Sequence, residues 1–386
     1  MAFSLACDTG KTTLRIEGID GDVTFNDVAN AGAGSVAVDG GGTEDPSFFV
    51  TEHVANDLYQ ILKNIQFGDG TNALTFYSKN EMVYFDDDQT FTIKSNATLQ
   101  LGEIAGDYCI NGASWSWEEG GDIIASGETT AICYIYDSRI HYRGTGRLGF
   151  IDGTIDFRNS IFSNFARTGS NSFYIAATVD NVILKNIYFS NWRQFALYNS
   201  PDTCEGLWIH YTDYALWFNV SAATLFEPRV TDEGLFQVRV AGIDQTIILK
   251  NPQFTLLQNK LNILQATSKI VSQFTCDIHV VDKDGANLQG VTVLCEDEAD
   301  SQVFSVSTGA DGKIAQQTIT YKKWEGTAET ETEYSPHKFT FSKNGYTLLV
   351  MKNVTVDARI NWDVEVKFPE RIRARMANPG RLAILR

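Results

Sequence analysis

Related segments recur through the middle of this chain at a nearly constant spacing. The segments VILKNIYF (182–189) and IILKNPQF (247–254) share Ile-Leu-Lys-Asn and a closing Phe, and ILKNIQF (61–67) carries the same core. Five apolar reference positions are separated by 26, 22, 21 and 24 residues: Ile161, Ile187, Ile209, Val230 and Phe254. A repeat of about two dozen residues predicts a solenoid, in which each unit packs only on its neighbours.

Alternation inside one repeat predicts short β-strands joined by a turn. In VILKNIYF, Val182 and Leu184 point to one face of a strand and the residues between them point to the other. Asn186 then stands at the turn between two strands, because Asn tolerates left-handed backbone angles. Stacked on its counterpart in the next coil, its amide can also pair along the solenoid axis. Leucine-rich repeats have a similar length, but their LxxLxLxxN register and helical half are absent from the sequence.

The LKNIYFSN segment (184–191) resembles the rungs of the right-handed parallel β-helix, pectin-lyase-like superfamily. The resemblance covers roughly residues 50–270. Pectate lyases, polygalacturonases, phage tailspikes and surface adhesins share this architecture. The resemblance implies a right-handed parallel β-helix, which we expect over residues 50–273, but it implies no particular chemistry because one fold serves many functions.

Residues 1–49 do not follow the repeat and are expected to form an N-terminal cap or docking segment. The glycine-rich stretch at 31–46 is typical of a loop or hinge. A cap is expected because the end coil of a solenoid exposes unpaired strand edges. Just after it, the apolar spacing of TEHVANDLYQILKN (51–64) predicts a short capping helix.

A different pattern of turns and alternating strands begins at Phe274. It is carried by Val281, Asp282, Gly285, Leu288, Gly290, Val291, Val293, Thr308, Asp311, Gly312, Lys343, Gly345 and Tyr346. These residues match the V-D-x-x-G-x-x-L-x-G-V-x-V, T-x-x-D-G and K-x-G-Y motifs, so the region resembles the carboxypeptidase-regulatory-like, transthyretin-like sandwich. The Asp-Gly pairs at 284–285 and 311–312 are hairpin signals. We therefore expect an all-β chain with a small antiparallel β-sandwich at 274–368, and the resemblance implies a non-catalytic spacer or binding module.

The composition excludes several kinds of site. The six cysteines contain no CxxC pair, and no P-loop, dinucleotide or HExxH pattern is present, so we expect no cofactor. Cys276 and Cys295 alternate in phase with apolar residues and are expected to be reduced core thiols, although a disulfide between them is geometrically possible.

The formal net charge of −17 argues against a nucleic-acid partner, which needs clustered Lys and Arg. The charge favours solubility, and the alternative is an acidic patch that binds cations or a basic partner. No segment approaches the roughly 20 apolar residues that cross a bilayer, and no signal peptide is visible. We therefore expect no membrane partner and a chain made in the host cytoplasm.

The C-terminal segment 369–386 has the opposite charge to the rest of the chain. Five arginines stand against the single Glu370: Arg371, Arg373, Arg375, Arg381 and Arg386. The segment is either a disordered tail or a basic arm that docks onto an acidic surface of a neighbouring copy or a capsid.

Two groups of carboxylates are candidates for chemistry. Asp152 and Asp156 are four residues apart, so on one strand they share a face and are suited to act as an acid and nucleophile pair. Asp86, Asp87 and Asp88 form a dense acidic turn that can hold calcium through oxygen ligands. For both groups the alternative is a set of solvated turn carboxylates.

Aromatic residues are the stronger functional feature of the sequence. Five tryptophans are candidate stacking platforms for sugar rings: Trp115, Trp117, Trp192, Trp208 and Trp217. The alternative is that these rings fill the interior of the β-helix, as aromatic stacks do.

Three functions fit these observations. The first is a virion structural protein of a tailed bacteriophage, a capsid decoration or a tail component, which is not an enzyme. Its expected partners are other virion proteins, further copies of itself (a trimer is the usual state of phage spikes) and a host surface glycan. The second is a polysaccharide depolymerase acting on the β-helix, and the third is a bacterial surface adhesin, which the missing secretion signal disfavours.

Overall fold

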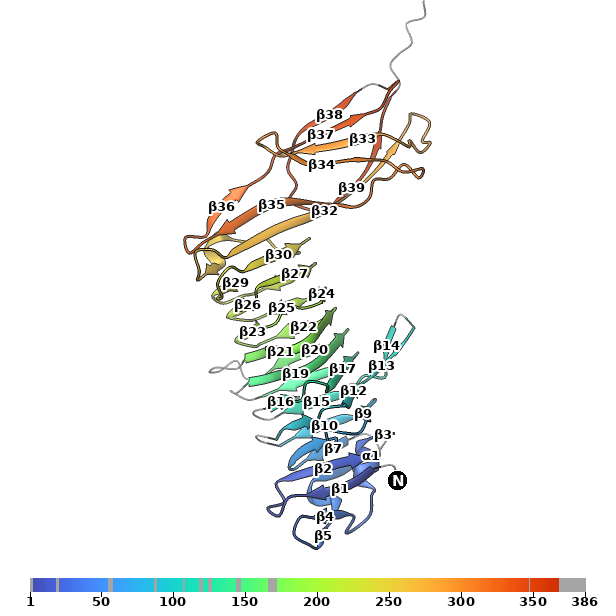
Figure 1. Ribbon diagram of the computed structural model, residues 1–386, viewed down its shortest axis with the longest axis vertical. Helices are drawn as coiled ribbons and strands as arrows, with labels where there is room; N and C mark the ends of the chain where they lie inside the picture. Colours follow the sequence, from blue (N-terminus) through green and yellow to red (C-terminus); the bar gives the residue numbers. More distant parts are fainter. Residues whose placement is uncertain are drawn as a thin grey trace, which may run out of the picture. The chain divides into compact units, whose positions relative to one another are not determined.

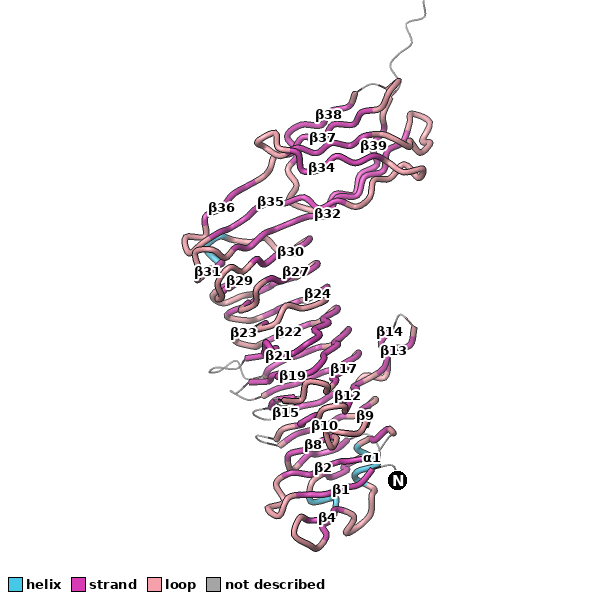
Figure 2. The backbone as a smooth tube through the Cα atoms, viewed as in Figure 1, coloured by secondary structure: helices cyan, strands magenta, loops and turns pink. Residues whose placement is uncertain are grey.

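The computed structural model describes residues 3–18, 21–54, 58–86, 89–106, 108–117, 121–123, 127–143, 147–165, 172–346 and 348–367. Strands make up 57% of the chain and helices 3% (Figure 2), which confirms the all-β prediction. The chain divides into two compact units, Met1–Gln273 with Lys322–Thr332, and Phe274–Tyr321 with Glu333–Arg386. Each unit has its own hydrophobic core. Lys322–Thr332 joins the first unit, although the sequence places it within 274–368.

The first unit is a parallel β-solenoid of about eight turns (Figure 1), so the β-helix prediction is confirmed. Its strands pair with their counterparts in the next coil and form three faces. The first face contains β7 (Leu58–Ile61), β10 (Met82–Phe85), β15 (Ser114–Trp117), β18 (Arg139–Tyr142), β20 (Ile161–Asn164), β22 (Tyr188–Ser190), β25 (Trp208–His210) and β28 (Arg229–Thr231). β6 (Val50–Val54) runs antiparallel to β7 at its edge.

Two further columns of parallel strands complete the coils. The second face contains β2 (Thr13–Gly18), β8 (Asn64–Phe67), β11 (Phe91–Ile93), β16 (Gly121–Ile123), the starts of β19 (Arg147–Arg158) and β21 (Ser172–Lys185), β23 (Gln194–Leu197), β26 (Tyr214–Phe218), β29 (Phe236–Val240) and β31 (Leu261–Ile263). The third face contains β3 (Asp22–Val23), β9 (Leu74–Ser78), β12 (Ala97–Leu101), β17 (Ile132–Tyr136), the ends of β19 and β21, β24 (Thr203–Glu205), β27 (Ala222–Phe226), β30 (Thr246–Lys250) and the start of β32 (Lys269–Val281).

Side chains at the same position of successive coils stack to form the core. On the first face Phe162, Phe189, Ile209 and Val230 pair in register and are buried. The rings of Phe162 and Phe189 are stacked with centroids 5.0 Å apart. Ile209 and Val230 are thus true equivalents, whereas Ile161 pairs with Tyr188 and points outward. One coil alone could not bury this column, which is why stacking stabilises the unit.

The predicted asparagine turn is confirmed at the corner between the third and first faces. Asn159 and Asn186 follow their third-face strands with positive φ angles of 51° and 53°. The Asn186 Nδ2 donates a hydrogen bond to the Asn159 Oδ1 at 3.0 Å, along the solenoid axis. Asn251 has the same left-handed conformation, with φ 49°. Asn64 of the earlier ILKN copy begins β8 instead, so that copy occupies a different corner.

The N-terminal segment adds further strands to the first coils of the solenoid. β1 (Phe3–Cys7) runs antiparallel to β2 and parallel to β4 (Val36–Val38), which pairs with β5 (Thr43–Glu44). The short helix α1 (Phe25–Ala29) begins at a capping box of Thr24 and Asp27 and buries Phe25 against Phe76. A single 3₁₀ turn, η1 (Pro46–Phe48), precedes β6. The helix predicted within 51–64 was wrong, because its described residues form β6 and β7.

Two smaller features interrupt or end the coils of the first unit. A hairpin of β13 (Glu103–Ala105) and β14 (Tyr108–Ile110) projects between β12 and β15 (Figure 1). Near the end of the unit, η2 (Gln258–Lys260) precedes β31. The segment Lys322–Thr332, which belongs to this unit, contains the turn between β35 (Gln317–Glu325) and β36 (Thr330–Glu333).

The second unit contains a four-stranded antiparallel sheet of β34 (Gln302–Ser307), β33 (Thr292–Glu296), β37 (His337–Ser342) and β38 (Leu349–Val354). β39 (Ile360–Glu365) pairs with the end of β32. Cys276 and Cys295 are buried and free, as expected for core thiols. The motif residue Thr308 is buried too, and its Oγ1 accepts the backbone N–H of Val291 at 3.0 Å.

Candidate functional site

Three of the five candidate tryptophans belong to the core and not to a binding surface. Trp115, Trp117 and Trp192 are 0% exposed. Trp117 stacks on Phe85 with centroids 4.4 Å apart and an interplanar angle of 3°. Because no ring face reaches solvent, their assignment as stacking platforms is wrong and the interior alternative holds for them.

The two candidate catalytic aspartates do not share a strand face. Gly153, with φ 76°, bends β19 between them, and the pairing of β19 with β21 shifts at the same place. Asp152 therefore lies at the corner between the second and third faces, whereas Asp156 lies on the third face. Their four-residue spacing loses the meaning it has on a regular strand.

Each of these aspartates is engaged in a local contact. The Asp152 carboxylate is 4% exposed and accepts the backbone N–H of Gly127 from the preceding coil at 2.5 Å. Asp156 is 6% exposed and accepts two hydrogen bonds from the Arg158 guanidinium at 2.8 and 2.7 Å. The Tyr136 hydroxyl lies 3.4 Å from the Asp156 Oδ2, and burial together with this carboxylate raises the Tyr136 pKa.

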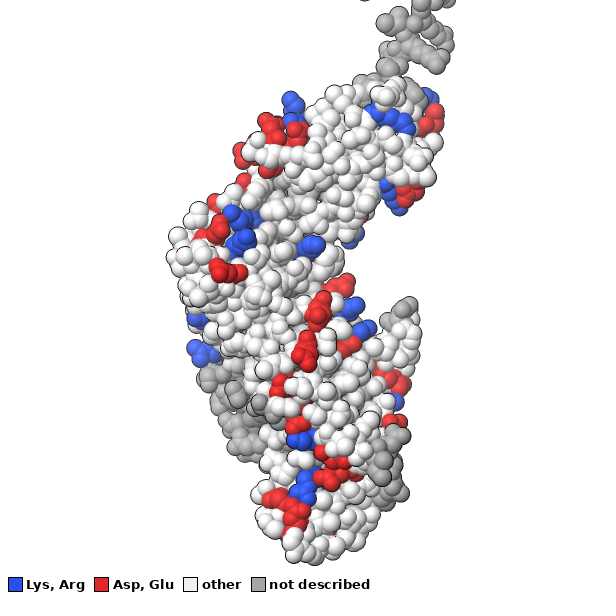
Figure 3. All heavy atoms as spheres, in the orientation of Figure 1, with Lys and Arg blue, Asp and Glu red and all other residues white. Residues whose placement is uncertain are grey.

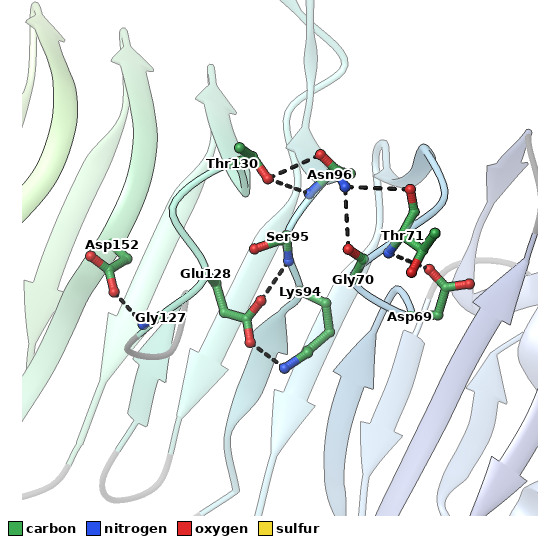
Figure 4. Close-up of polar contacts among 10 residues, drawn as sticks. All are labelled: Asp69, Gly70, Thr71, Lys94, Ser95, Asn96, Gly127, Glu128, Thr130 and Asp152. Atoms are coloured by element: carbon green, nitrogen blue, oxygen red, sulfur yellow. Dashed lines mark hydrogen bonds and ion pairs between the residues drawn. The ribbon is translucent and has the colours of Figure 1, made fainter.

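Polar side chains satisfy the backbone along the same corner (Figure 4). The Glu128 carboxylate pairs with Lys94 and accepts the backbone N–H of Ser95 at 2.6 Å. Burial raises the pKa of Glu128, but these two donors outweigh it and hold the pKa below its usual value. The contact between the Asp152 carboxylate and the Gly127 N–H repeats this arrangement in the next coil. Carboxylates here replace missing strand pairing, which is a structural role.

The remaining sequence candidates are placed only in part. Asp86 accepts a hydrogen bond from the Gln60 Nε2 at 2.8 Å, while Asp87 and Asp88 lie outside the described residues. No group of three or more His, Cys, Asp or Glu residues suited to a metal occurs in the part of the chain that the structure describes. The arm residues Arg371, Arg373, Arg375, Arg381 and Arg386 also lie outside it.

Trp208 is a partly exposed ring on the outer side of the first face. It stands in register between Tyr188 and Arg229, and the Arg229 guanidinium lies 4.2 Å from its ring centroid. The Tyr188 ring contacts it edge-on at 4.8 Å. The Trp208 Nε1 donates a hydrogen bond to the Thr231 Oγ1 at 3.0 Å, which fixes the indole.

Trp217 occupies a similar position on the second face. Arg239 lies 4.2 Å from the centroid of its ring and 5.2 Å from that of Tyr214. Tyr214 in turn contacts Phe236. Trp208 and Trp217 therefore belong to different faces, so the sequence candidates form two separate surfaces and not one.

A hollow lies beside the Trp217 group on the second face, and no pattern in the sequence points to it. Its volume is about 410 Å³, and it is lined by Ser172, Tyr174, Ala176, Ala177, Gln194 and Tyr198. The rings of Tyr174 and Tyr198 are nearly perpendicular, with centroids 6.4 Å apart. Lone tyrosines on separate coils become neighbours only through the register of β21 and β23, which the sequence does not reveal.

Charge elsewhere on the solenoid is mainly negative. On the face drawn in Figure 3, acidic side chains run in a line along the solenoid with a smaller number of Lys and Arg side chains among them. The arginines over Trp208 and Trp217 thus stand out against a chain with a net charge of −17.

No family model, curated protein or solved structure matches this chain. None of the described helices is long and apolar enough to span a membrane.

Proposed function

We propose that this chain is a structural protein of a tailed-bacteriophage particle, a capsid decoration or a tail component, that binds glycans on the host surface. The observation that carries the proposal is the pair of outward aromatic groups at Trp208 and Trp217, each beneath an arginine. A sugar would pack against the part of each ring and guanidinium that reaches solvent, and the guanidinium adds hydrogen-bond donors. A stacked solenoid holds both groups rigidly, because its coils share one continuous core.

The proposal includes the finer fold assignments that the sequence motifs suggest. We take the solenoid to be of the right-handed, pectin-lyase-like type and the second unit to be of the carboxypeptidase-regulatory type. In support of the latter, Asp282 accepts the backbone N–H groups of Asp284 and Ala286, and Gly312 has φ 73°. These motif residues shape turns, which suits a spacer or binding module.

Assembly is the second part of the proposal. We expect the chain to form a homo-oligomer, with a trimer as the first possibility, and to contact other virion proteins in the particle. The basic segment 369–386 is proposed to dock onto an acidic neighbour, a choice supported by its five arginines. The location of the protein is then the virion.

A depolymerase that uses Asp152 and Asp156 has little support. Both carboxylates are almost fully buried and are engaged by Gly127 and Arg158. A catalytic pair needs one carboxyl group on each side of a sugar bond, within reach of substrate. We therefore retain glycan binding and do not propose hydrolysis at these residues.

Glycan binding is tested with the purified full chain on an array of host surface glycans. The double variant Trp208→Ala, Trp217→Ala should lose at least tenfold in affinity, because stacking on these rings contributes on the order of 1 kcal/mol or more each. Phe226→Ala removes an aromatic side chain from the third face and should bind as the wild type does. Equal binding by all three proteins, or no glycan binding by the wild type, would exclude the proposed glycan contact.

The assembly proposal is tested by deleting 369–386. Light scattering should report an oligomer for the full chain and a smaller species for the truncated one, and the truncated chain should enter particles less efficiently. Unchanged mass together with unchanged incorporation would remove the arm from the proposal.

A further inference from the structure

We infer that the second face carries a binding strip for an acidic oligosaccharide, whose carboxylate is held at Arg239. The inference deepens the proposed function and rests on it. The strip consists of the hollow at Tyr174, Gln194 and Tyr198 and the group Tyr214, Trp217 and Arg239. It commits the second face to one ligand class, sugars bearing a carboxylate, such as hexuronic or sialic acids.

Strand register places these side chains in two outward rows. Gln194 pairs with Tyr214, and Tyr214 with Phe236, in one row. In the other row, Tyr174 pairs with Ala196, Ala196 with Trp217, and Trp217 with Arg239. From β21 to β29 the rows cross three strand spacings, about 14 Å. That length accommodates a short run of sugar units laid along the solenoid axis.

The shape and lining of the hollow are better suited to binding a sugar ring than to contacting a flat surface of another protein. Its volume is about 410 Å³, and two tyrosines and two alanines are among the residues that line it. The Gln194 amide adds one acceptor and two donors at the wall. Apolar ring faces with a few polar groups at the edge match the alternating faces and hydroxyls of a pyranose.

Arg239 supplies the preference for an acid. Its guanidinium lies against Trp217 and Tyr214, and no ion pair joins it to any residue that the structure describes. The Arg239 Nε and the Trp217 Nε1 are buried without a hydrogen-bond partner. Leaving such donors unsatisfied costs free energy, and an arginine fork binds a carboxylate well. A ligand carboxylate would bind the outer nitrogens of the guanidinium, because the Arg239 Nε and the Trp217 Nε1 are themselves buried.

The test compares two oligosaccharides of equal length and linkage, one of hexuronic acid and one of the neutral hexose. Titration calorimetry on the full chain should show tighter binding of the acidic oligomer, and added salt should weaken this preference. Arg239→Gln should weaken binding of the acidic oligomer about tenfold and weaken binding of the neutral oligomer much less, so that the preference for the acid is lost. Lys250→Gln removes a cation from the third face and should change neither. Gln194→Ala provides a second variant, which is expected to weaken the binding of both oligomers.

The outcomes separate this inference from the proposed function. If Arg239→Gln binds both oligomers as the wild type does while Trp208→Ala, Trp217→Ala loses glycan binding, the acidic strip is wrong and the function stands. A wild type that binds neutral and acidic oligomers equally also overturns the strip. If the Arg239→Gln or Gln194→Ala variant instead changes the oligomeric mass in light scattering, the strip is a contact between copies and the inference fails.

Discussion

Trp115 and Trp208 lie on the same face of the solenoid, yet one is core and the other is surface. In β15 Trp115 occupies the position that pairs with Val83 and Ile140, whose side chains point inward. In β25 Trp208 stands one place earlier in the register, level with Tyr188 and Arg229, and points outward. A shift of one residue on a strand moves a side chain to the opposite face. Register, and not residue type, therefore decides which tryptophans can meet a ligand.

The largest expected effect tests the inward side of this comparison. Trp117→Ala should lower the free energy of unfolding by about 3–5 kcal/mol, because it leaves a cavity among packed rings. Trp208→Ala should cost less than about 1 kcal/mol, since its ring is partly exposed. Urea titration followed by circular dichroism measures both. Similar losses in the two variants would show that Trp208 is part of the core, which contradicts the comparison.

Trp217 shows why the outward side could not be read from the sequence. Simple alternation in β26 would place Ala215 and Trp217 on one side and Leu216 on the other. In the structure Ala215 and Leu216 are both buried, and the pairing with β23 shifts between Gln194 and Ala196. This bulge reverses the alternation and turns Trp217 outward. The sequence predicted the solenoid and its asparagine turns correctly, because these depend on a repeated local pattern, whereas bulges and register depend on tertiary contacts.

The residues at the corner between the second and third faces have a structural role, as the inward tryptophans do. A Cβ added at Gly153 would lie 2.2 Å from the Ala131 carbonyl oxygen, and the residue has φ 76°. Gly153→Ala should therefore cost about 2–3 kcal/mol, through both backbone strain and overpacking. Gly70 has a similar φ of 81° but open space around it, so Gly70→Ala isolates the strain and should cost less. Equal losses by urea titration would mean that the close approach at Gly153 is relieved cheaply.

Asp152 gives a smaller and more specific test of the same corner. Asp152→Ala leaves the Gly127 N–H without its acceptor and should cost about 1–2 kcal/mol of stability. Glycan binding should be unchanged, since the residue has a structural role. Asp180→Ala removes an exposed carboxylate and should leave stability within about 0.5 kcal/mol of the wild type. Loss of glycan binding or of glycan cleavage in Asp152→Ala, at unchanged stability, would restore the catalytic interpretation.

The smallest expected effect depends on pH and concerns Glu128. Its folded-state pKa lies below the ordinary value of 4.5, because Lys94 and the Ser95 N–H favour the carboxylate over the acid. The folded state then binds protons less readily than the unfolded state, so the contribution of Glu128 to stability is fully present above pH 4.5 and is lost as the pH falls through the folded pKa. The stability difference between the wild type and Glu128→Gln should accordingly be constant from pH 7 to about 5 and shrink toward pH 3.

Thr98→Ser, a change on the third face that involves no titratable group, should show no such trend. A difference for Glu128→Gln that stays constant down to pH 3 would mean that the carboxylate charge contributes nothing at this corner. The polar corner would then rely on its neutral hydrogen bonds alone, as at Thr130, whose Oγ1 accepts the Asn96 backbone N–H at 3.0 Å. In that case Glu128 would stabilise the corner through its hydrogen bond to the Ser95 N–H and not through its charge.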